Sequence, residues 1–134
     1  MRLLLVEDEP FIALDLQLLS TAAGHEVVGV ADCFDSALAL AASAEPDAVL
    51  VDINLRDGFS GVRIARALTG RGQVAVGFVT GNAEQIPPDF AGALAVLEKP
   101  FTQAGVEEIL DILQTAHGGG PARVGAPRYA RVAR

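Results

Sequence analysis

Five short apolar runs recur along the chain, with room for a helix between each pair. They are four to six residues long and contain no polar side chain: Leu3–Val6, Val27–Val30, Ala48–Val51, Val74–Val79 and Leu94–Leu97. Strands with one solvent-exposed face would alternate apolar and polar residues. Continuous apolar runs instead suit strands that are buried on both faces of a parallel sheet. The pattern predicts a five-stranded parallel sheet covered by helices.

The segments between the runs have helical patterns. In the first and last segments, apolar residues recur at spacings of three and four, which places them on one helix face: Ile12, Leu16, Leu19 and Ala23, then Val106, Ile109, Leu110 and Leu113. In the second segment, Asp35-Ser36 can cap a helix that continues to about Ala44. In the third, Ser60-Gly61 precedes a helical stretch that stops at Gly70.

The fourth segment is the exception. Residues 82–92 contain Pro87-Pro88, and proline removes a backbone donor and clashes with the preceding helical turn. We expect one or two helical turns there. The sequence therefore predicts β-α repeated five times, with a shortened fourth helix.

The composition changes near the end of the chain. After Ala116, His117 is followed by three glycines and a proline, and the remainder is mostly Gly, Pro, Ala and Arg without periodicity. We expect a single domain at residues 1–116 and a flexible tail at residues 117–134. The tail arginines could meet an acidic partner or a membrane surface, but a disordered end is the simpler interpretation.

Charge and composition exclude several function classes. Residues 1–116 hold all 17 acids and six of the ten bases, and such an acidic body would repel a nucleic-acid backbone. We therefore expect no direct DNA binding. No apolar stretch approaches the roughly 18 residues that a membrane span needs. Cys33 is the only cysteine, so no disulfide can form within one chain, and a reducing cytoplasm is the expected location.

Polar side chains gather where the predicted strands end. Glu7-Asp8 follow the first strand, Asp52 the third, Thr80 ends the fourth, and Lys99 follows the fifth. The carboxyl ends of parallel strands form one edge, where ligands bind in open α/β sheets. We expect these five residues to form one site.

The carboxylates of the predicted site favour a metal ion. Three carboxylates within about 4 to 6 Å repel one another by roughly 1 to 4 kcal/mol per pair. A bound cation would relieve that repulsion. Oxygen ligands without histidine or cysteine favour a hard ion, and Mg²⁺ keeps coordination positions for an incoming phosphate. Mg²⁺ is the expected cofactor.

Lys99 is the only lysine in the chain. A compact ammonium at the end of a buried strand suits a point-charge contact with a phosphate. A carboxylate can accept a phosphoryl group to form an acyl phosphate, and the protein then contributes positioning and charge. Asp52 is the candidate acceptor, with Thr80 and Lys99 as candidates for contacting the phosphoryl oxygens.

The ordered motifs resemble the receiver domains of response regulators in two-component signalling. The resemblance covers residues 2 to about 116 and rests on Leu5-Val6-Glu7-Asp8-Glu9, Asp52, Thr80 and Lys99-Pro100-Phe101. It implies a flavodoxin-like (βα)5 fold with a doubly wound parallel sheet in the order 2-1-3-4-5. Phe78-Val79-Thr80-Gly81 is similar to the Phe-Ala-Thr-Gly subgroup, many members of which are single-domain proteins.

The resemblance also implies roles for the site residues. Asp52 is the phosphoacceptor, Thr80 and Lys99 contact the phosphoryl group, and Lys99-Pro100 is a cis bond. Asp8, Asp52 and the backbone carbonyl of Asn54 are the metal ligands, and Glu7 acts through water. The expected partners are a histidine kinase or histidine phosphotransfer protein and an unknown downstream protein. A homodimer that forms through the face of the predicted fourth helix, fifth strand and fifth helix is a further alternative.

Three other interpretations compete with this hypothesis. Glu7 and Asp8 alone could simply favour the dipole of the following helix. A magnesium phosphohydrolase of the haloacid dehalogenase type also forms an aspartyl phosphate. It needs a second acid two residues after the nucleophile, where this chain has Asn54. A pseudo-receiver that only binds a partner would be favoured if a member of the quintet were missing, but the quintet is complete. We therefore expect a phosphorylation-dependent switch rather than an enzyme.

Overall fold

The computed structural model describes residues 1–71, 74–118 and 130–132. Its strands are β1 (Arg2–Val6), β2 (Glu26–Ala31), β3 (Ala48–Val51), β4 (Ala75–Thr80), β5 (Ala95–Glu98) and β6 (Ala130–Val132). Its helices are α1 (Pro10–Ala22), α2 (Phe34–Ala44), α3 (Gly61–Thr69) and α4 (Gln103–His117), and two 3-10 turns are η1 (Ala83–Gln85) and η2 (Phe90–Gly92).

The strands form one parallel sheet in the order β2-β1-β3-β4-β5-β6. The predicted order 2-1-3-4-5 and the flavodoxin-like fold are confirmed. The predicted number of strands is one too few, because β6 pairs in parallel with β5, with Ala130 opposite Ala95. This strand is three residues long and has an arginine at its centre, so it lacks the apolar run that marks the other five.

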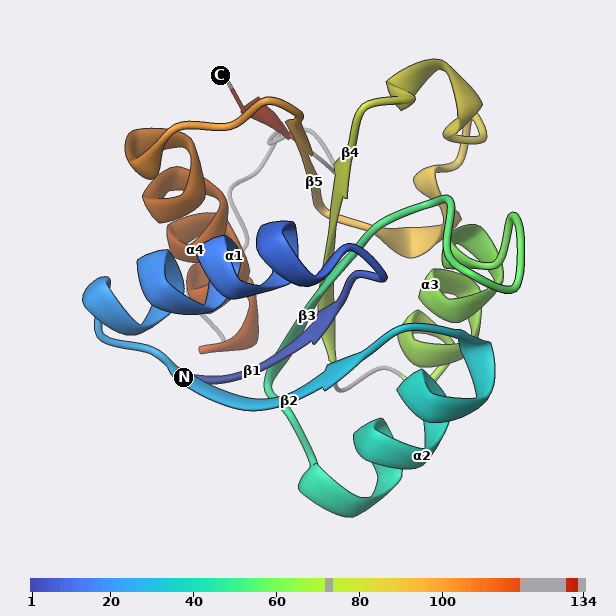
Figure 1. The fold of residues 1–134 in the computed structure, drawn as a ribbon, viewed down its shortest axis with the longest axis horizontal. Coiled ribbons are helices and arrows are strands. Elements are labelled where there is room, and N and C mark those ends of the chain that lie inside the picture. Colours follow the sequence, from blue (N-terminus) through green and yellow to red (C-terminus); the bar gives the residue numbers. More distant parts are fainter. Residues whose placement is uncertain (72–73, 119–129, 133–134) are drawn as a thin grey trace.

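The sheet is the middle of three layers (Figure 1). Successive side chains of a strand point to opposite faces. Leu3 and Leu5 of β1 accordingly pack in the core beneath α1 and α4, whereas Leu4 and Val6 pack in the core beneath α2 and α3. All four side chains are buried. Burial on both faces explains why β1, β3, β4 and β5 lack polar alternation. The edge strand β2 is only partly buried, and Val30 is 42% exposed.

The connection from β4 to β5 contains no regular α-helix, as predicted. It forms η1 and η2, which lie on either side of Pro87-Pro88. Phe90 and Ala91 in η2 both have positive φ, of 56° and 51°, which costs a non-glycine residue about 1 to 2 kcal/mol. Neighbouring side chains must therefore hold η2 in place.

The predicted start of α2 is late. The helix begins at Phe34, and Cys33 is its N-cap residue. Ser36 is the third helical residue, and its Oγ accepts a hydrogen bond from the Cys33 amide at 3.3 Å. The serine caps this helix by reaching back from inside the first turn, an arrangement known as a capping box.

Most of the predicted tail, residues 117–134, lies outside the described residues. His117 is the last residue of α4, and Ala130–Val132 form β6. The domain boundary near residue 116 therefore stays a prediction. In the described parts of the chain, no helix combines the length and apolar character needed to cross a membrane.

Candidate phosphoacceptor site

The carboxyl ends of the strands bring the predicted side chains to one edge of the sheet. β1 leads to Glu7 and Asp8, β3 leads to Asp52, and β1 and β3 are neighbours at the point where the strand order reverses. Glu7 and Asp52 are buried, at 3% and 7% exposure. Charged groups are rarely buried to this extent unless they are paired.

Lys99 supplies the pairing charge. Its Nζ donates to Glu7 Oε2 at 2.8 Å and to Asp52 Oδ2 at 2.9 Å. The other oxygen of Asp52 accepts from the Ile53 amide at 2.7 Å. One ammonium therefore joins two carboxylates that come from different strands. The strand ends predict that these residues share one edge, but they do not predict which atoms pair. Lys99 and Glu7 are 92 residues apart in the sequence.

Burial changes the protonation of Glu7. Removal from water raises the pKa of Glu7 to about 7, although the hydrogen bond from Lys99 opposes this rise, and the negative charge of Asp52 adds to it. Burial by itself would lower the pKa of Lys99, but its hydrogen bonds to Glu7 and Asp52 raise that pKa overall. Glu7 can thus take up a proton near neutral pH while Lys99 keeps its charge.

The acidic side chains suit a hard divalent cation. Glu7, Asp8 and Asp52 each offer a carboxylate oxygen, and these oxygens lie within 4.8 Å of one another. Asp8 is half-buried, whereas Glu7 and Asp52 are buried. Carboxylate oxygens at this spacing, without nitrogen or sulfur, are a donor set that fits Mg²⁺. Receiver domains typically bind Mg²⁺ at such an acidic cluster.

Thr80 lies at the same edge of the sheet. Its side chain is fully buried, and its backbone carbonyl accepts from the Lys99 amide at 2.9 Å. The Thr80 Oγ1 accepts from the Asn82 amide at 3.0 Å and keeps its own hydrogen to donate. The Lys99-Pro100 bond is cis, as the resemblance implies.

Gly61 and Gln85 also belong to the surroundings of Asp52, and neither was singled out for the site from the sequence. Gly61 opens α3 against the backbone of Asp52, where a Cβ would overlap the Asp52 carbonyl oxygen. Asn54, two residues after Asp52, donates its side-chain amide to Gln85 of η1 at 2.9 Å. Gly61 was recognised only as a helix start, and no feature of the sequence pairs residues 54 and 85.

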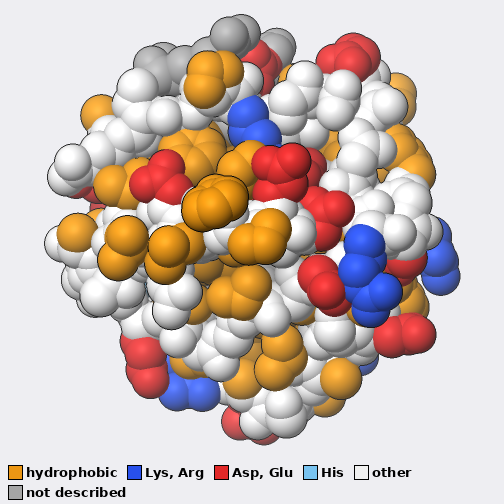
Figure 2. All heavy atoms as spheres, viewed as in Figure 1, with side chains coloured by type: hydrophobic (Ala, Val, Ile, Leu, Met, Phe, Trp, Pro, Cys, Tyr) orange, Lys and Arg blue, Asp and Glu red, His pale blue; other side chains and the backbone are white. Residues whose placement is uncertain are grey.

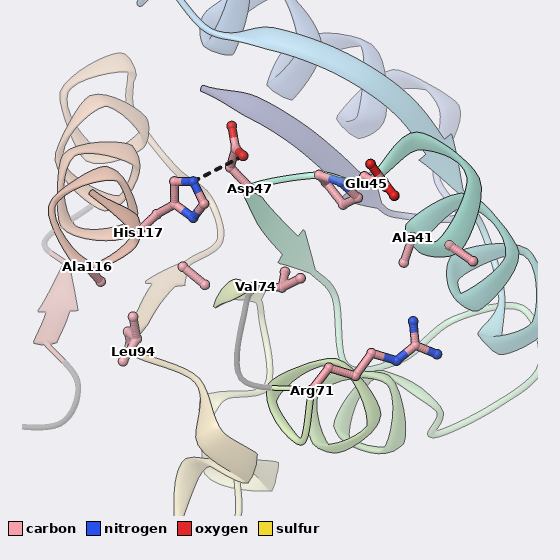
Figure 3. A pocket seen from close by; sticks show the side chains of 11 residues that line it. Ala41, Glu45, Asp47, Arg71, Val74, Leu94, Ala116 and His117 are labelled. Atoms are coloured by element: carbon pink, nitrogen blue, oxygen red, sulfur yellow. Dashed lines mark ion pairs between the residues drawn. The ribbon is translucent and has the colours of Figure 1, made fainter. Parts of the chain in front are cut away.

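A hollow lies at the other edge of the sheet. It has a volume of about 770 Å³ and is lined by residues at the amino ends of β3, β4 and β5 and at the ends of three helices (Figure 3). His117 Nε2 and Asp47 Oδ1 lie 3.1 Å apart beside it. The lining includes none of the predicted site residues.

Comparison with known proteins identifies the family. The model of the response regulator receiver domain matches residues 3–111. The regulator PhyR of Methylorubrum extorquens is 36% identical over 110 residues, which are 81% of this chain and 41% of that protein. The transcriptional regulatory protein PdtaR of Mycobacterium tuberculosis is 35% identical over 104 residues, 75% of this chain and 50% of that protein.

Solved structures of response regulators are also similar to this chain. The receiver domain of PhyR from Erythrobacter litoralis has a TM-score of 0.77 and 31% identity, with 84% of this chain and 88% of that chain covered. SdrG from Sphingomonas melonis has a TM-score of 0.73 and 35% identity, with 84% and 95% covered. The chain spans half or less of the lengths of the curated relatives. This chain belongs to the response regulator receiver domain family.

Proposed function

We propose that this domain accepts a phosphoryl group on Asp52 from a histidine kinase or histidine phosphotransfer protein, and that the acyl phosphate switches its contacts with another protein. The observation that carries the proposal is the Lys99 ammonium, held between the buried carboxylates of Glu7 and Asp52. A cation placed at an acceptor carboxylate can contact the phosphoryl oxygens as charge develops on them.

The proposed reaction is a simple displacement. A carboxylate oxygen of Asp52 attacks the phosphorus of the donor's phosphohistidine and forms a P–O bond. The P–N bond breaks, and its electron pair stays on the donor's imidazole. Lys99 and the Thr80 hydroxyl then donate to the oxygens of the transferred group. Both are held by backbone contacts at the ends of adjacent strands, so little reorganisation is needed.

Mg²⁺ completes the proposed site. Asp8, Asp52 and the backbone carbonyl of Asn54 would hold it, with Glu7 acting through water. When bound, the ion supplies positive charge that offsets the phosphoryl oxygens. Lys99 alone leaves three neighbouring carboxylates only partly compensated. The proposed location is the cytoplasm, which suits the unpaired Cys33.

A macromolecular donor is favoured by the surface next to the site. Phe11, Leu14 and Leu18 of α1 are 87%, 51% and 61% exposed, and their spacing places them on one side of the helix. Figure 2 shows hydrophobic side chains gathered over α1, beside a group of acidic side chains. Clustered exposed apolar residues mark protein contact sites more often than small-molecule sites.

The proposed output passes through the loop after β4. Many receivers have an aromatic residue three positions before the lysine, but here that position is Val96. The remaining route is Thr80, because movement of its hydroxyl toward a phosphoryl group would pull Asn82. A downstream partner would read this loop and the adjoining part of α4. A homodimer through the β5 side would have to accommodate β6, which already pairs with β5.

The test is phosphorylation with a small phosphodonor and Mg²⁺. The wild type should gain one acid-stable, base-labile phosphate, and Asp52→Asn should lower labelling to background. Asp15→Asn, which changes an exposed carboxylate on α1, is the matched control and should label like the wild type. Undiminished labelling of Asp52→Asn would refute the acceptor assignment.

A further inference from the structure

One side-chain hydrogen bond joins the loop after β3 to the loop after β4. Asn54 Nδ2 donates to Gln85 Oε1 at 2.9 Å, across 31 residues of sequence. Asn54 is half-buried and Gln85 is exposed. The family resemblance gives Asn54 a role only through its backbone carbonyl, and it gives Gln85 none. This bond is therefore unexplained by the function proposed so far.

The same short loop touches the site at a second point. The Asn82 amide donates to Thr80 Oγ1 at 3.0 Å. Between the two contacts, η1 is closed by hydrogen bonds from the Gln85 amide to the Asn82 carbonyl at 2.9 Å and from the Ile86 amide to the Ala83 carbonyl at 3.1 Å. The turn therefore links a residue on the strand next to Asp52 with a residue on the loop that carries Asp52.

The rest of the connection to β5 is held by a different element. Arg66 of α3 binds both carboxylate oxygens of Asp89, at 2.7 and 3.1 Å. Thr69 Oγ1 of α3 donates to the Ala91 carbonyl at 3.1 Å. These contacts attach η2 to α3 and stabilise its positive φ angles. A change at the site would thus move η1 more readily than η2.

We propose that Gln85 is a positioning residue of the Asp52 site. By accepting the Asn54 amide, it fixes the loop whose Asn54 carbonyl is a proposed metal ligand, and it couples that loop to η1. The inference rests on the proposed function and assigns the site a second connection to η1, in addition to Thr80. Coupling between two sites is reciprocal. Ion binding should stabilise the observed position of η1 by some factor. Loss of the hydrogen bond that holds η1 should then weaken ion binding by the same factor.

The expected size of the effect follows from the kind of bond. A hydrogen bond between two partly exposed neutral amides shifts an equilibrium by a factor of about 2 to 10. Such a bond is strong enough to bias the position of η1 and weak enough to open when a phosphoryl group arrives. Partners in the outer shell of metal sites change metal affinity by comparable or larger factors.

The first experiment uses the metal-free full chain and amide hydrogen exchange. Gln85→Ala and Asn54→Ala each remove one side of the bond, and either should lower the protection factor of the Ile86 amide about 3- to 10-fold. The double variant should match the single variants, because only one bond is lost. Gln85→Glu keeps an acceptor oxygen and should stay within about 2-fold of wild type, as should Glu84→Ala, the exposed neighbour in η1.

The second experiment titrates the same variants with Mg²⁺ and follows the Ile53 amide by NMR. Gln85→Ala should raise the dissociation constant about 3- to 10-fold, and Glu84→Ala should leave it unchanged. Ile86 protection within about 2-fold of wild type in Gln85→Ala, additive loss in the double variant, or unchanged Mg²⁺ affinity would each overturn the proposal. A wild type that binds no Mg²⁺ would overturn the proposed function instead, and the Ile86 comparison would still decide whether the bond holds η1.

Discussion

The two edges of the sheet carry similar groups in different environments. At the carboxyl edge, the side chains of Glu7 and Lys99 are only 1% and 18% exposed. At the amino edge, the neighbouring side chains of His117 and Asp47 are 38% and 27% exposed, beside the hollow of about 770 Å³. A buried charge costs several kcal/mol unless it is compensated, whereas an exposed pair gains and costs little. The cost of burying charge, rather than the size of a hollow, therefore distinguishes the chemical site.

The largest expected difference between the two edges concerns backbone packing. Gly61→Ala would push a Cβ into the Asp52 carbonyl oxygen and should cost about 3 kcal/mol of unfolding free energy. Gly70→Ala, one residue before Arg71 at the amino-edge hollow, meets no comparable overlap and should change it by less than about 1 kcal/mol. Urea denaturation measures both. Equal losses would show that the carboxyl edge is no more tightly packed than the amino edge.

A smaller difference in unfolding free energy is expected when one side chain is removed at each edge, Lys99 at the carboxyl edge and His117 at the amino edge. Lys99→Met leaves the buried carboxylates of Glu7 and Asp52 without their cation, and at pH 8 it should cost about 2 to 3 kcal/mol. His117→Ala should cost at most about 0.5 kcal/mol, because both side chains of the His117–Asp47 contact are partly exposed to solvent. The unfolding free energies of both variants at pH 8 test this. Similar losses would contradict the contrast between the edges.

The pH dependence of stability should also be set at the carboxyl edge. Because burial raises the pKa of Glu7 from 4.5 to about 7, the folded protein binds a proton that the unfolded chain releases between these values. This contribution is complete below about pH 4.5 and is lost as the pH rises through about 7. The metal-free protein should therefore lose about 1 to 3 kcal/mol between pH 5 and 8.

The control for the pH experiment is Glu7→Gln, which removes the titrating group. The unfolding free energy of this variant should change little between pH 5 and 8. Lys99 stays charged throughout, since its pKa is raised. Urea denaturation at several pH values provides the measurement. If the unfolding free energy of Glu7→Gln still fell with rising pH, the pH dependence would belong to another group.

The smallest effect is expected from the end of the chain. Deletion of residues 118–134 removes the described strand β6, which is a three-residue addition at the edge of the sheet. We expect the unfolding free energy to fall by less than about 1 kcal/mol, and phosphorylation to be unchanged. Thermal melting and labelling of the truncated chain measure this. A loss of several kcal/mol would show that the tail is part of the folded domain.

Much of the fold follows from local pattern. The five apolar runs predicted β1 to β5, and burial on both faces accounts for the runs of β1, β3, β4 and β5 but not for that of the partly exposed edge strand β2. Pro87-Pro88 predicted the shortened fourth helix. β6 was missed because Ala130-Arg131-Val132 has no such run, and its pairing depends on the position of β5. The two positive φ angles at Phe90 and Ala91 depend on contacts from α3.

The candidate site was predictable as a set of residues but not as a set of contacts. The rule that parallel strands end at one edge predicted that Glu7, Asp8, Asp52, Thr80 and Lys99 meet. Which atoms pair within that edge depends on side-chain geometry over many residues of sequence. The double contact of Lys99 and the bond from Asn54 to Gln85 are therefore visible only in the folded chain.

The most direct test of the account locates the phosphoryl group itself. Borohydride reduces the acyl phosphate of an aspartate to homoserine, so the phosphorylated protein can be reduced, digested and sequenced by mass spectrometry. The account predicts homoserine at position 52, at no other acidic position, and only after treatment with a phosphodonor. Homoserine at Asp8 or another aspartate, or the longer alcohol that reduction of a glutamyl phosphate would leave at Glu7, with Asp52 unmodified, would contradict it.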